Sequence, residues 1–292
     1  MKLGIDVSQH QLTWDELLAR VRFAEDAGFE HAWVFDHFKA LYGDPRGPCL
    51  EGWTLLAALG AATERIRLGA LVTGVTYRHP SLLATEAVTV DHVSKGRLEL
   101  GIGAAWFEQE HRELGIDFPP TRERVERLDE ALEVMKALMT SDSVSFDGRH
   151  YRLDNATYRP RPVQQPHPPI WIGASGAKRM LPLAGRHADV WHSWGGAERL
   201  QAKWDVVRRA AEDSGRDPSS IQRATDLSIS EDWDTVRAAG EAIVEAGWEH
   251  LIVSWPGEGL PRVEEFLEKI APDLAPRSKG GATPGTTRHR RP

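Results

Sequence analysis

Trp33-Val34-Phe35-Asp36-His37 is the stretch that decides the fold of this 292-residue chain. A continuous apolar run ends in a carboxylic acid and an imidazole, at the point where a strand would open into a loop. Parallel strands that are covered on both faces are continuously apolar, and ionisable side chains at their carboxyl ends are typical of a pocket floor. The stretch therefore predicts a buried parallel strand that leads into a functional site.

Seven further apolar runs alternate with amphipathic segments along the chain. The eight predicted strands are Leu3 to Val7, His31 to Phe35, Ile66 to Val72, Arg97 to Ile102, Ile170 to Gly173, Ala188 to His192, Ile221 to Ser228 and His250 to Trp255. Strands that alternate with helices favour parallel pairing. Eight such units in about 275 residues match one closed (β/α)8 TIM barrel, with a doubly wound open sheet as the alternative.

Local signals place several helices between these strands. Thr13 and Glu16 form a capping box that begins the first helix, and Pro80 begins another that runs to about Val93. An apolar stripe predicts a third helix, with Val125, Leu128, Leu132, Met135 and Met139 on one face. The connection from Trp106 to Pro169 is too long for one crossover helix and contains a hairpin, Ser143 to Leu153. We expect this insertion between the fourth and fifth strands to build a wall of the active site.

Composition and charge narrow the range of functions. The formal net charge is -7, and no basic run appears before Arg288-His289-Arg290-Arg291. Binding to nucleic acid needs a basic face, so we expect no such partner. No linker appears before residue 275, which predicts one domain over residues 1–275 and a disordered tail over residues 276–292. The single cysteine, Cys49, and the lack of a signal peptide or a membrane-spanning run predict a cytoplasmic protein with no membrane partner.

Two of the predicted strands end in glycine-rich segments. Gly173-Ala174-Ser175-Gly176-Ala177 leads into a predicted helix, Lys178 to Gly185, whose free N–H groups would face an anion such as phosphate. The alternative is that Ser175 only caps that helix. Gly101-Ile102-Gly103 lacks the third glycine of a dinucleotide fingerprint, because Trp106 stands in its place. No histidine or cysteine pair has the spacing of metal ligands, so we expect no metal.

Several blocks of the chain together resemble the bacterial luciferase-like superfamily. Within it the chain is most similar to the deazaflavin-dependent (coenzyme F420) oxidoreductases. Members are (β/α)8 barrels that bind a flavin or a deazaflavin, often as homodimers. The resemblance covers about residues 1–275, and the blocks that carry it are Trp33 to His37, Arg67 to Pro80, Leu83-Ala84, Ser94 to Gly103, Glu110-His111 and Pro168 to Gly173.

The resemblance implies a position for each part of the coenzyme. The tricyclic ring would lie against the ends of the second to fourth strands, backed by a non-proline cis peptide at Ala70-Leu71. Asp36 and His37 would contact the ring and the reacting end of the substrate. The remaining cofactor contacts implied are Gly103 and Ala104 at the ring edge, Gln109 as a polar contact, and Ser175, Gly176 and Ala177 at the phosphate.

The same resemblance suggests which residues carry out the reaction. His37 would be the acid/base that moves the proton accompanying hydride transfer, and Asp36 would orient the ring or the imidazole. Trp106 and Phe107 stand where sugar-phosphate dehydrogenases of the superfamily carry a catalytic glutamate, which favours an apolar or planar substrate. Glu108 and Glu110 could substitute as acids or form a solvated face. His192 and Trp194 would line the same pocket.

Three functions remain open at the level of the sequence. The first is an oxidoreductase that transfers hydride between coenzyme F420 and a small organic substrate. The second is an FMN-dependent monooxygenase on the same scaffold, supplied with reduced flavin by a separate reductase. The third is a non-catalytic flavin-binding barrel, because a fold does not by itself determine a function.

Overall fold

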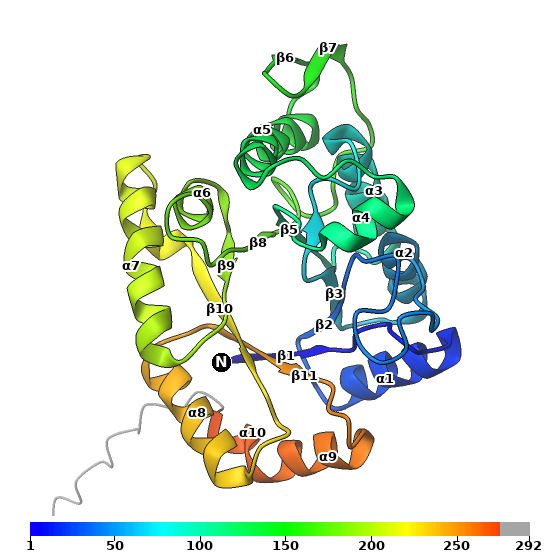
Figure 1. The fold of residues 1–292 in the computed structure, drawn as a ribbon, viewed down its shortest axis with the longest axis vertical. Helices are drawn as coiled ribbons and strands as arrows, with labels where there is room; N and C mark the ends of the chain where they lie inside the picture. The colour runs from blue at the N-terminus through cyan, green and yellow to red at the C-terminus, as the bar shows by residue number, and fades with distance from the viewer. Residues whose placement is uncertain (275–292) are drawn as a thin grey trace, which may run out of the picture.

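A closed parallel barrel forms the centre of the computed structural model, which describes residues 1–274 (Figure 1). Its strands are β1 Lys2–Asp6, β2 His31–Val34, β3 Arg67–Ala70, β5 Leu98–Gly103, β8 Ile170–Gly173, β9 Val190–His192, β10 Gln222–Leu227 and β11 His250–Ser254. The strand order is β3-β2-β1-β11-β10-β9-β8-β5, and parallel pairing of β3 with β5 closes the circle. All eight predicted strands and the TIM barrel are confirmed, and the open sheet is excluded. The predicted tail, residues 276–292, lies outside the described residues.

Helices surround the barrel on its outer face (Figure 1). They are α1 Trp14–Asp26, α2 Gly52–Ala62, α3 Pro80–Val93, α4 Glu108–Leu114, α5 Thr121–Thr140, α6 Met180–His187, α7 Ala197–Asp213, η1 Pro218–Ser220, α8 Trp233–Glu245, α9 Leu260–Lys269 and α10 Ala271–Leu274. The capping box of Thr13 and Glu16 is present, and Pro80 is the first residue of α3. Within residues 1–274, none of the helices combines the length and the apolar character needed to cross a lipid bilayer.

The connection between β5 and β8 is the predicted insertion. It contains α4, α5 and an antiparallel hairpin of β6 Val144–Asp147 and β7 Arg152–Ala156, which projects away from the barrel (Figure 1). The predicted hairpin is thus confirmed, and its turn is closed by a hydrogen bond from the Gly148 N–H to the Tyr151 carbonyl (3.0 Å). Only the part of the insertion before and at the start of α5 reaches the cavity described below.

Two tryptophans fill the middle of the barrel. Trp33 of β2 and Trp171 of β8 pack edge to face with ring centroids 4.5 Å apart, in a cluster with Val190, Ala224 and Ile252. Strands alternate inward and outward residues, and glycine stands at inward positions beside these rings. A Cβ atom at Gly69 would lie 2.4 Å from the Trp33 ring, so a larger residue there would collide with it. The interior is a packed plug that separates the two mouths of the barrel.

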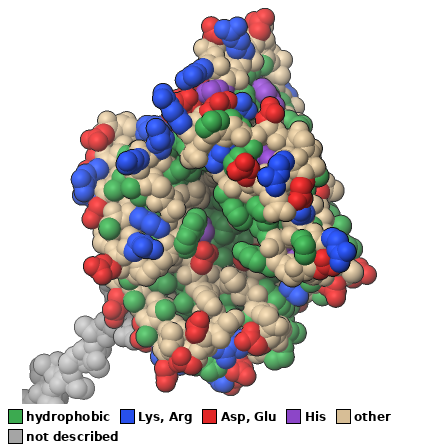
Figure 2. All heavy atoms as spheres, in the orientation of Figure 1, with side chains coloured by type: hydrophobic (Ala, Val, Ile, Leu, Met, Phe, Trp, Pro, Cys, Tyr) green, Lys and Arg blue, Asp and Glu red, His purple; other side chains and the backbone are tan. Residues whose placement is uncertain are grey.

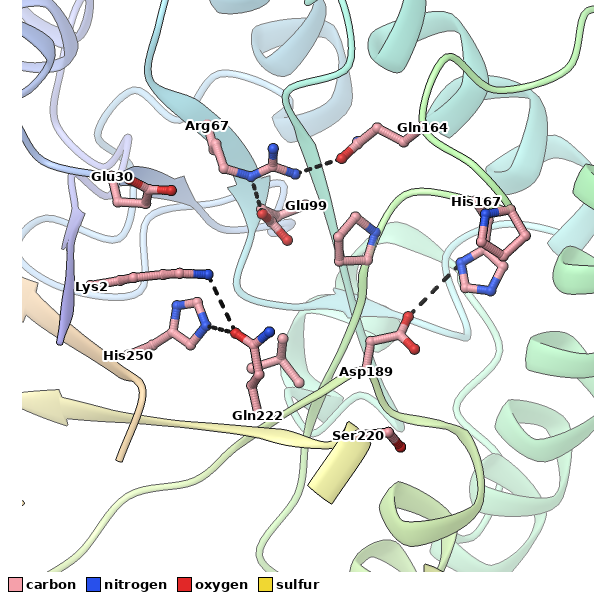
Figure 3. Close-up of a pocket in the computed structure, with 13 residues that line it drawn as sticks. Lys2, Glu30, Arg67, Glu99, Gln164, His167, Asp189, Ser220, Gln222 and His250 are labelled. Atoms are coloured by element: carbon pink, nitrogen blue, oxygen red, sulfur yellow. Dashed lines mark hydrogen bonds and ion pairs between the residues drawn. The ribbon is translucent and has the colours of Figure 1, made fainter. Parts of the chain in front are cut away.

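A polar cavity of about 400 Å³ lies at the amino-terminal mouth, below this plug (Figure 3). The Arg67 guanidinium pairs with the Glu99 carboxylate and donates to Gln164 Oε1 (2.7 Å). Gln222 Oε1 lies 2.5 Å from His250 Nε2, and Glu99 Oε2 accepts a hydrogen bond from Trp171 Nε1 (2.5 Å). These groups satisfy one another, which fits the rule that this face of a TIM barrel contributes stability rather than catalysis.

Protonation of the buried histidines should make the protein less stable in acid. Burial lowers the pKa of His250 to about 3, whereas an unfolded histidine titrates near about 6.5. The unfolded chain therefore binds more protons below pH 6.5, and stability falls as the pH decreases. We expect His250→Gln to remove about 1–2 kcal/mol of the loss between pH 6.5 and 5, because one pKa unit corresponds to about 1.4 kcal/mol. Urea unfolding at a series of pH values measures this loss.

The exposed His92 offers the control, and His92→Gln should leave the slope of stability against pH as it is in the parent protein. Burial raises the pKa of Glu99, and this shift makes the folded protein more stable as the pH falls. The effect is the same in the parent protein and in both variants. An unchanged slope in His250→Gln would contradict this account of the polar cluster.

Candidate active site

A cavity of about 590 Å³ opens at the carboxyl ends of the strands, and the space-filling view shows hydrophobic side chains gathered around a hollow near the centre of the molecule (Figure 2). This mouth is where TIM barrels carry their active sites. The cavity is lined by His37, Leu71, Val72, Thr73, Gly74, Tyr77, Gly103, Ala104, Ala105, Trp106, Thr121, Arg124, Val125, Gly173, Ser175, Gly176, Met180, His192 and Trp194. The structure thus brings together residues from the ends of five strands and from the insertion.

The floor of the cavity is apolar and is formed where β3 is interrupted. The peptide bond between Leu71 and Val72 is cis, and the two-residue strand β4, Thr73–Gly74, follows it. The predicted position at Ala70-Leu71 is therefore wrong by one residue, because Ala70 is still paired with Val34 in the β2–β3 ladder. Ala70 is buried and does not line the cavity.

Glycines at the ends of the neighbouring strands leave room for this floor. A Cβ atom at Gly103 would lie 2.9 Å from Val72 Cγ2, and one at Gly173 would lie 3.2 Å from the same atom. The glycine-rich strand ends in the sequence are thus explained by the close approach of the Val72 side chain. Together they leave room for the Val72 side chain at the cavity floor.

His37 is held by Glu110, which sequence reasoning treated only as a possible acid or a solvated charge. The Glu110 side chain is completely buried, and its Oε2 lies 3.0 Å from His37 Nδ1. Its other oxygen accepts a hydrogen bond from the Phe38 N–H (2.7 Å), and Tyr77 Oη donates to Oε2 (2.5 Å). In the structure, Glu110 and the adjacent His111 are the buried residues of α4. The sequence around them is polar, and a glutamate in a polar helix is normally expected to be exposed, so its burial could not be predicted from the sequence.

The hydrogen bonds around Glu110 determine that its carboxyl group is ionised. Burial raises the pKa of Glu110, but the hydrogen bonds from His37, Tyr77 and Phe38 outweigh burial and leave it lowered. Burial and the neighbouring carboxylate raise the pKa of Tyr77, which stays protonated and donates. An ionised Glu110 accepts the His37 Nδ1–H, so this tautomer leaves Nε2 free to exchange a proton with a ligand.

Asp36 is not among the residues that line the cavity, and within residues 1–274 no hydrogen bond joins its carboxylate to the His37 imidazole. Its buried carboxylate accepts two hydrogen bonds from Arg78, at 2.6 Å and 3.1 Å. Arg78 also pairs with Glu51 and Glu86. Burial raises the pKa of Asp36 and Arg78 opposes this effect. Asp36 anchors the loop that carries His37, while Glu110 orients the imidazole.

Aromatic side chains surround the mouth of the cavity. Trp106 after β5 and Trp194 after β9 both line it and are 64% and 55% exposed. Phe107 packs against the His37 ring, with centroids 5.9 Å apart, but does not line the cavity. Gln109 is exposed on α4, donates to Glu113 Oε1 (2.7 Å) and is not among the residues that line the cavity.

The residues predicted to contact a phosphate line the cavity only in part. Ser175 and Gly176 line it, whereas Ala177 does not. The predicted helix begins later than expected, at Met180, and no side chain caps it, so the alternative of Ser175 as a helix cap is wrong. Arg124 of α5 donates to the Ala104 carbonyl (3.0 Å), and within residues 1–274 its guanidinium has no carboxylate partner. The guanidinium also donates to the Pro119 carbonyl (2.6 Å) and stacks on the Phe118 ring (3.9 Å to the centroid), which hold it at the cavity wall.

One cluster among the described residues has the spacing of cation ligands, and it lies outside the cavity. It consists of Asp129, Glu133 and His187 on α5 and α6. Asp129 already binds Arg186 (2.6 Å) and His187 (2.7 Å). The cluster is therefore separate from the cavity, and its Asp129 carboxylate already has basic partners within the fold.

The chain is similar to known proteins of the luciferase-like family over most of its length. The sequence profile of the family described as luciferase-like monooxygenase matches residues 1–277. The chain is 31% identical to the F420-dependent hydroxymycolic acid dehydrogenase of Mycobacterium tuberculosis over 81% of this chain and 65% of that protein. It is 32% identical to the F420-dependent glucose-6-phosphate dehydrogenase of Kineococcus radiotolerans over 82% and 70%, respectively. The chain therefore spans about two thirds of the length of these relatives.

Two further relatives extend the range of chemistry on this fold. The chain is 32% identical to the FMNH2-dependent dimethylsulfone monooxygenase of Pseudomonas putida over 73% of this chain and 59% of that protein. A solved structure of an F420-dependent secondary alcohol dehydrogenase in complex with an F420–acetone adduct superimposes with a TM-score of 0.82 at 21% identity. That match covers 94% of this chain and 98% of the other. At this identity the match establishes the shared fold.

Adding a methyl group at Gly103 should destabilise the protein by about 1–3 kcal/mol, the usual cost of overpacking. The Cβ of Gly103→Ala would press on the Val72 side chain, which forms part of the cavity floor. Gly176→Ala is the matched control, because its Cβ would meet nothing closer than Met180 at 3.8 Å. Denaturant unfolding compares the two, and equal stability of both variants would show that the floor can relax.

Proposed function

We propose that this chain, which belongs to the luciferase-like monooxygenase family, is an F420-dependent oxidoreductase. It would transfer hydride between coenzyme F420 and an organic substrate with an apolar or planar body. The observation that carries the proposal is the pairing of His37 with the buried Glu110 beside an apolar cavity floor of Leu71 and Val72. F420-dependent relatives over most of the chain support the choice of coenzyme.

The residues of the cavity fit a tricyclic coenzyme that carries a phosphate. Leu71 and Val72 would support the ring, and the open space above Gly176, where a Cβ would meet only Met180, would admit the phosphate. Arg124 supplies a positive charge without a carboxylate of its own among the described residues. When bound, a deazaflavin supplies or accepts hydride at a ring carbon and is a poor partner for oxygen.

His37 would move the proton that accompanies the hydride. With Nδ1–H donated to Glu110, Nε2 can give a proton to a substrate oxygen during reduction or take one during oxidation. The buried negative charge of Glu110 stabilises the imidazolium that forms when Nε2 holds its proton. Trp106 and Trp194 at the mouth would cover the bound substrate and limit the access of water.

The aromatic mouth also supports a substrate class. Among the relatives, one is named for a hydroxymycolic acid and another for glucose-6-phosphate. In this chain Trp106 and Trp194 present indole surface to the cavity, which stabilises apolar or planar molecules by burial of their surface. We therefore propose an apolar or planar substrate over a sugar phosphate.

An FMN-dependent monooxygenase is the second candidate, because one relative of similar identity uses reduced FMN. Such an enzyme would need a separate reductase as a partner. A homodimer is a further prediction that follows from the family resemblance. The non-catalytic alternative is less consistent with the His37–Glu110 pair, because a binding protein has no need of a buried carboxylate that prepares an imidazole for proton exchange.

A titration of the purified chain with each coenzyme separates these candidates. We expect micromolar affinity for oxidised F420 and affinity for FMN weaker by about 10-fold or more, a difference of at least about 1.4 kcal/mol. Quenching of coenzyme fluorescence measures both dissociation constants. Tighter binding of FMN would support the monooxygenase, and binding of neither would reject both coenzyme assignments.

Replacing Glu110 with glutamine should slow the reaction by about 10²-fold, within the usual contribution of general acid–base catalysis. The amide keeps the shape but not the charge that stabilises the imidazolium. The rate is followed as oxidation of reduced F420 by para-hydroxyacetophenone, a planar ketone, across the pH range. Glu113→Gln is the control, because Glu113 lies on the same helix but is exposed and pairs with Lys39. Equal rates and pH profiles in both variants would show that Glu110 is only structural.

A further inference from the structure

A second histidine–carboxylate pair lies in the wall of the same cavity. His192 is the last residue of β9, it lines the cavity, and it is only 5% exposed. Its Nε2 lies 3.0 Å from Asp226 Oδ1 on the neighbouring strand β10. The Asp226 carboxylate therefore orients the imidazole through one hydrogen bond, although its side chain is 37% exposed, unlike the buried Glu110 beside His37.

The free nitrogen of His192 has no protein partner. Within residues 1–274, Nδ1 makes no hydrogen bond, and it is not enclosed by protein atoms. The His192 ring packs beside Trp194, with centroids 6.3 Å apart, so a polar nitrogen stands next to an aromatic surface. A polar atom that is open to the cavity on a nearly buried side chain favours ligands that hydrogen-bond to it over those that cannot.

The strand order places the two histidines across the barrel from each other. Around the closed circle β3-β2-β1-β11-β10-β9-β8-β5, β2 and β9 are four strands apart in either direction. His37 follows β2 and His192 ends β9, so the imidazoles approach the cavity from opposite sides. The apolar floor of Leu71 and Val72 lies on the arc of β3, β5 and β8 between them.

We propose that His192, held by Asp226, is a specificity-determining residue that binds a second polar group of the substrate. This proposal rests on the function proposed above, in which His37 serves the reacting group. The substrates would be planar or apolar molecules with hydrogen-bonding groups at both ends. A site that is built to hydrogen-bond a hydroxyl group discriminates strongly against the analogue that lacks it.

The test compares substrates that differ only in the distal hydroxyl group. Acetophenone and para-hydroxyacetophenone form one pair, and the corresponding naphthyl ketones form a longer pair. Each is titrated into the full chain loaded with oxidised F420, and the change in coenzyme absorbance gives the dissociation constant. We expect the parent protein to prefer the hydroxylated member of at least one pair by about 10-fold or more.

Two variants should remove this preference without changing coenzyme binding. His192→Ala deletes the imidazole. Asp226→Asn keeps the His192 side chain but removes the carboxylate charge that orients its ring. His187→Ala is the matched control, because His187 Nε2 binds Asp129 Oδ1 in the same way (2.7 Å) but outside the cavity. The control should keep the full preference for the hydroxylated ketone.

The possible results separate the two proposals. Absence of a hydroxyl preference in the coenzyme-loaded parent protein, or a preference that survives in both variants, overturns the assignment of His192 alone. Weaker F420 binding in both variants, by the same factor as ketone binding, also overturns it, because His192 would then contact the coenzyme. Failure of the parent chain to bind F420 at all overturns the proposed function together with this inference.

Discussion

The packing of Trp33 against Trp171 inside the barrel is the interaction on which the remaining structure depends. Two indoles fill a volume that TIM barrels usually fill with branched aliphatic side chains. They fit only because glycine stands at inward positions such as Gly69. Leu71 packs against this cluster, so the plug supports the floor of the cavity from below. The same plug closes the barrel and separates the paired charges of one mouth from the ligand cavity of the other.

The cavity combines parts that arise from different regions of the chain. The strands supply the floor and two histidines, whereas the insertion supplies Glu110 and Arg124. Glu110 has no exposure to solvent, so its negative charge is stabilised by its hydrogen bonds to His37, Tyr77 and the backbone. A buried carboxylate without these partners would favour its neutral form. The pairing therefore fixes both the position of the insertion and the orientation of the imidazole.

Much of the fold could be predicted from the sequence, because parallel strands that are buried on both faces consist of continuous apolar runs. The run that ends at His37 and the glycine-rich ends at Gly103 and Gly173 indicated the correct mouth of the barrel. Side-chain direction at the rim could not be predicted in this way. Asp36 and His37 are neighbours, yet one turns to Arg78 and the other to the cavity, and this depends on partners 42 and 73 residues away. The position of the cis peptide and the burial of Glu110 depend on tertiary packing for the same reason.

The separation between His37 and Glu110 along the chain has a consequence for how this protein would lose activity. The helix that carries Glu110 has only seven residues and lies outside the strand ladder. Local opening of such a short segment needs less free energy than unfolding of the whole molecule. Mild heating or a substitution that loosens α4 would therefore separate Glu110 from His37 before the strands unfold.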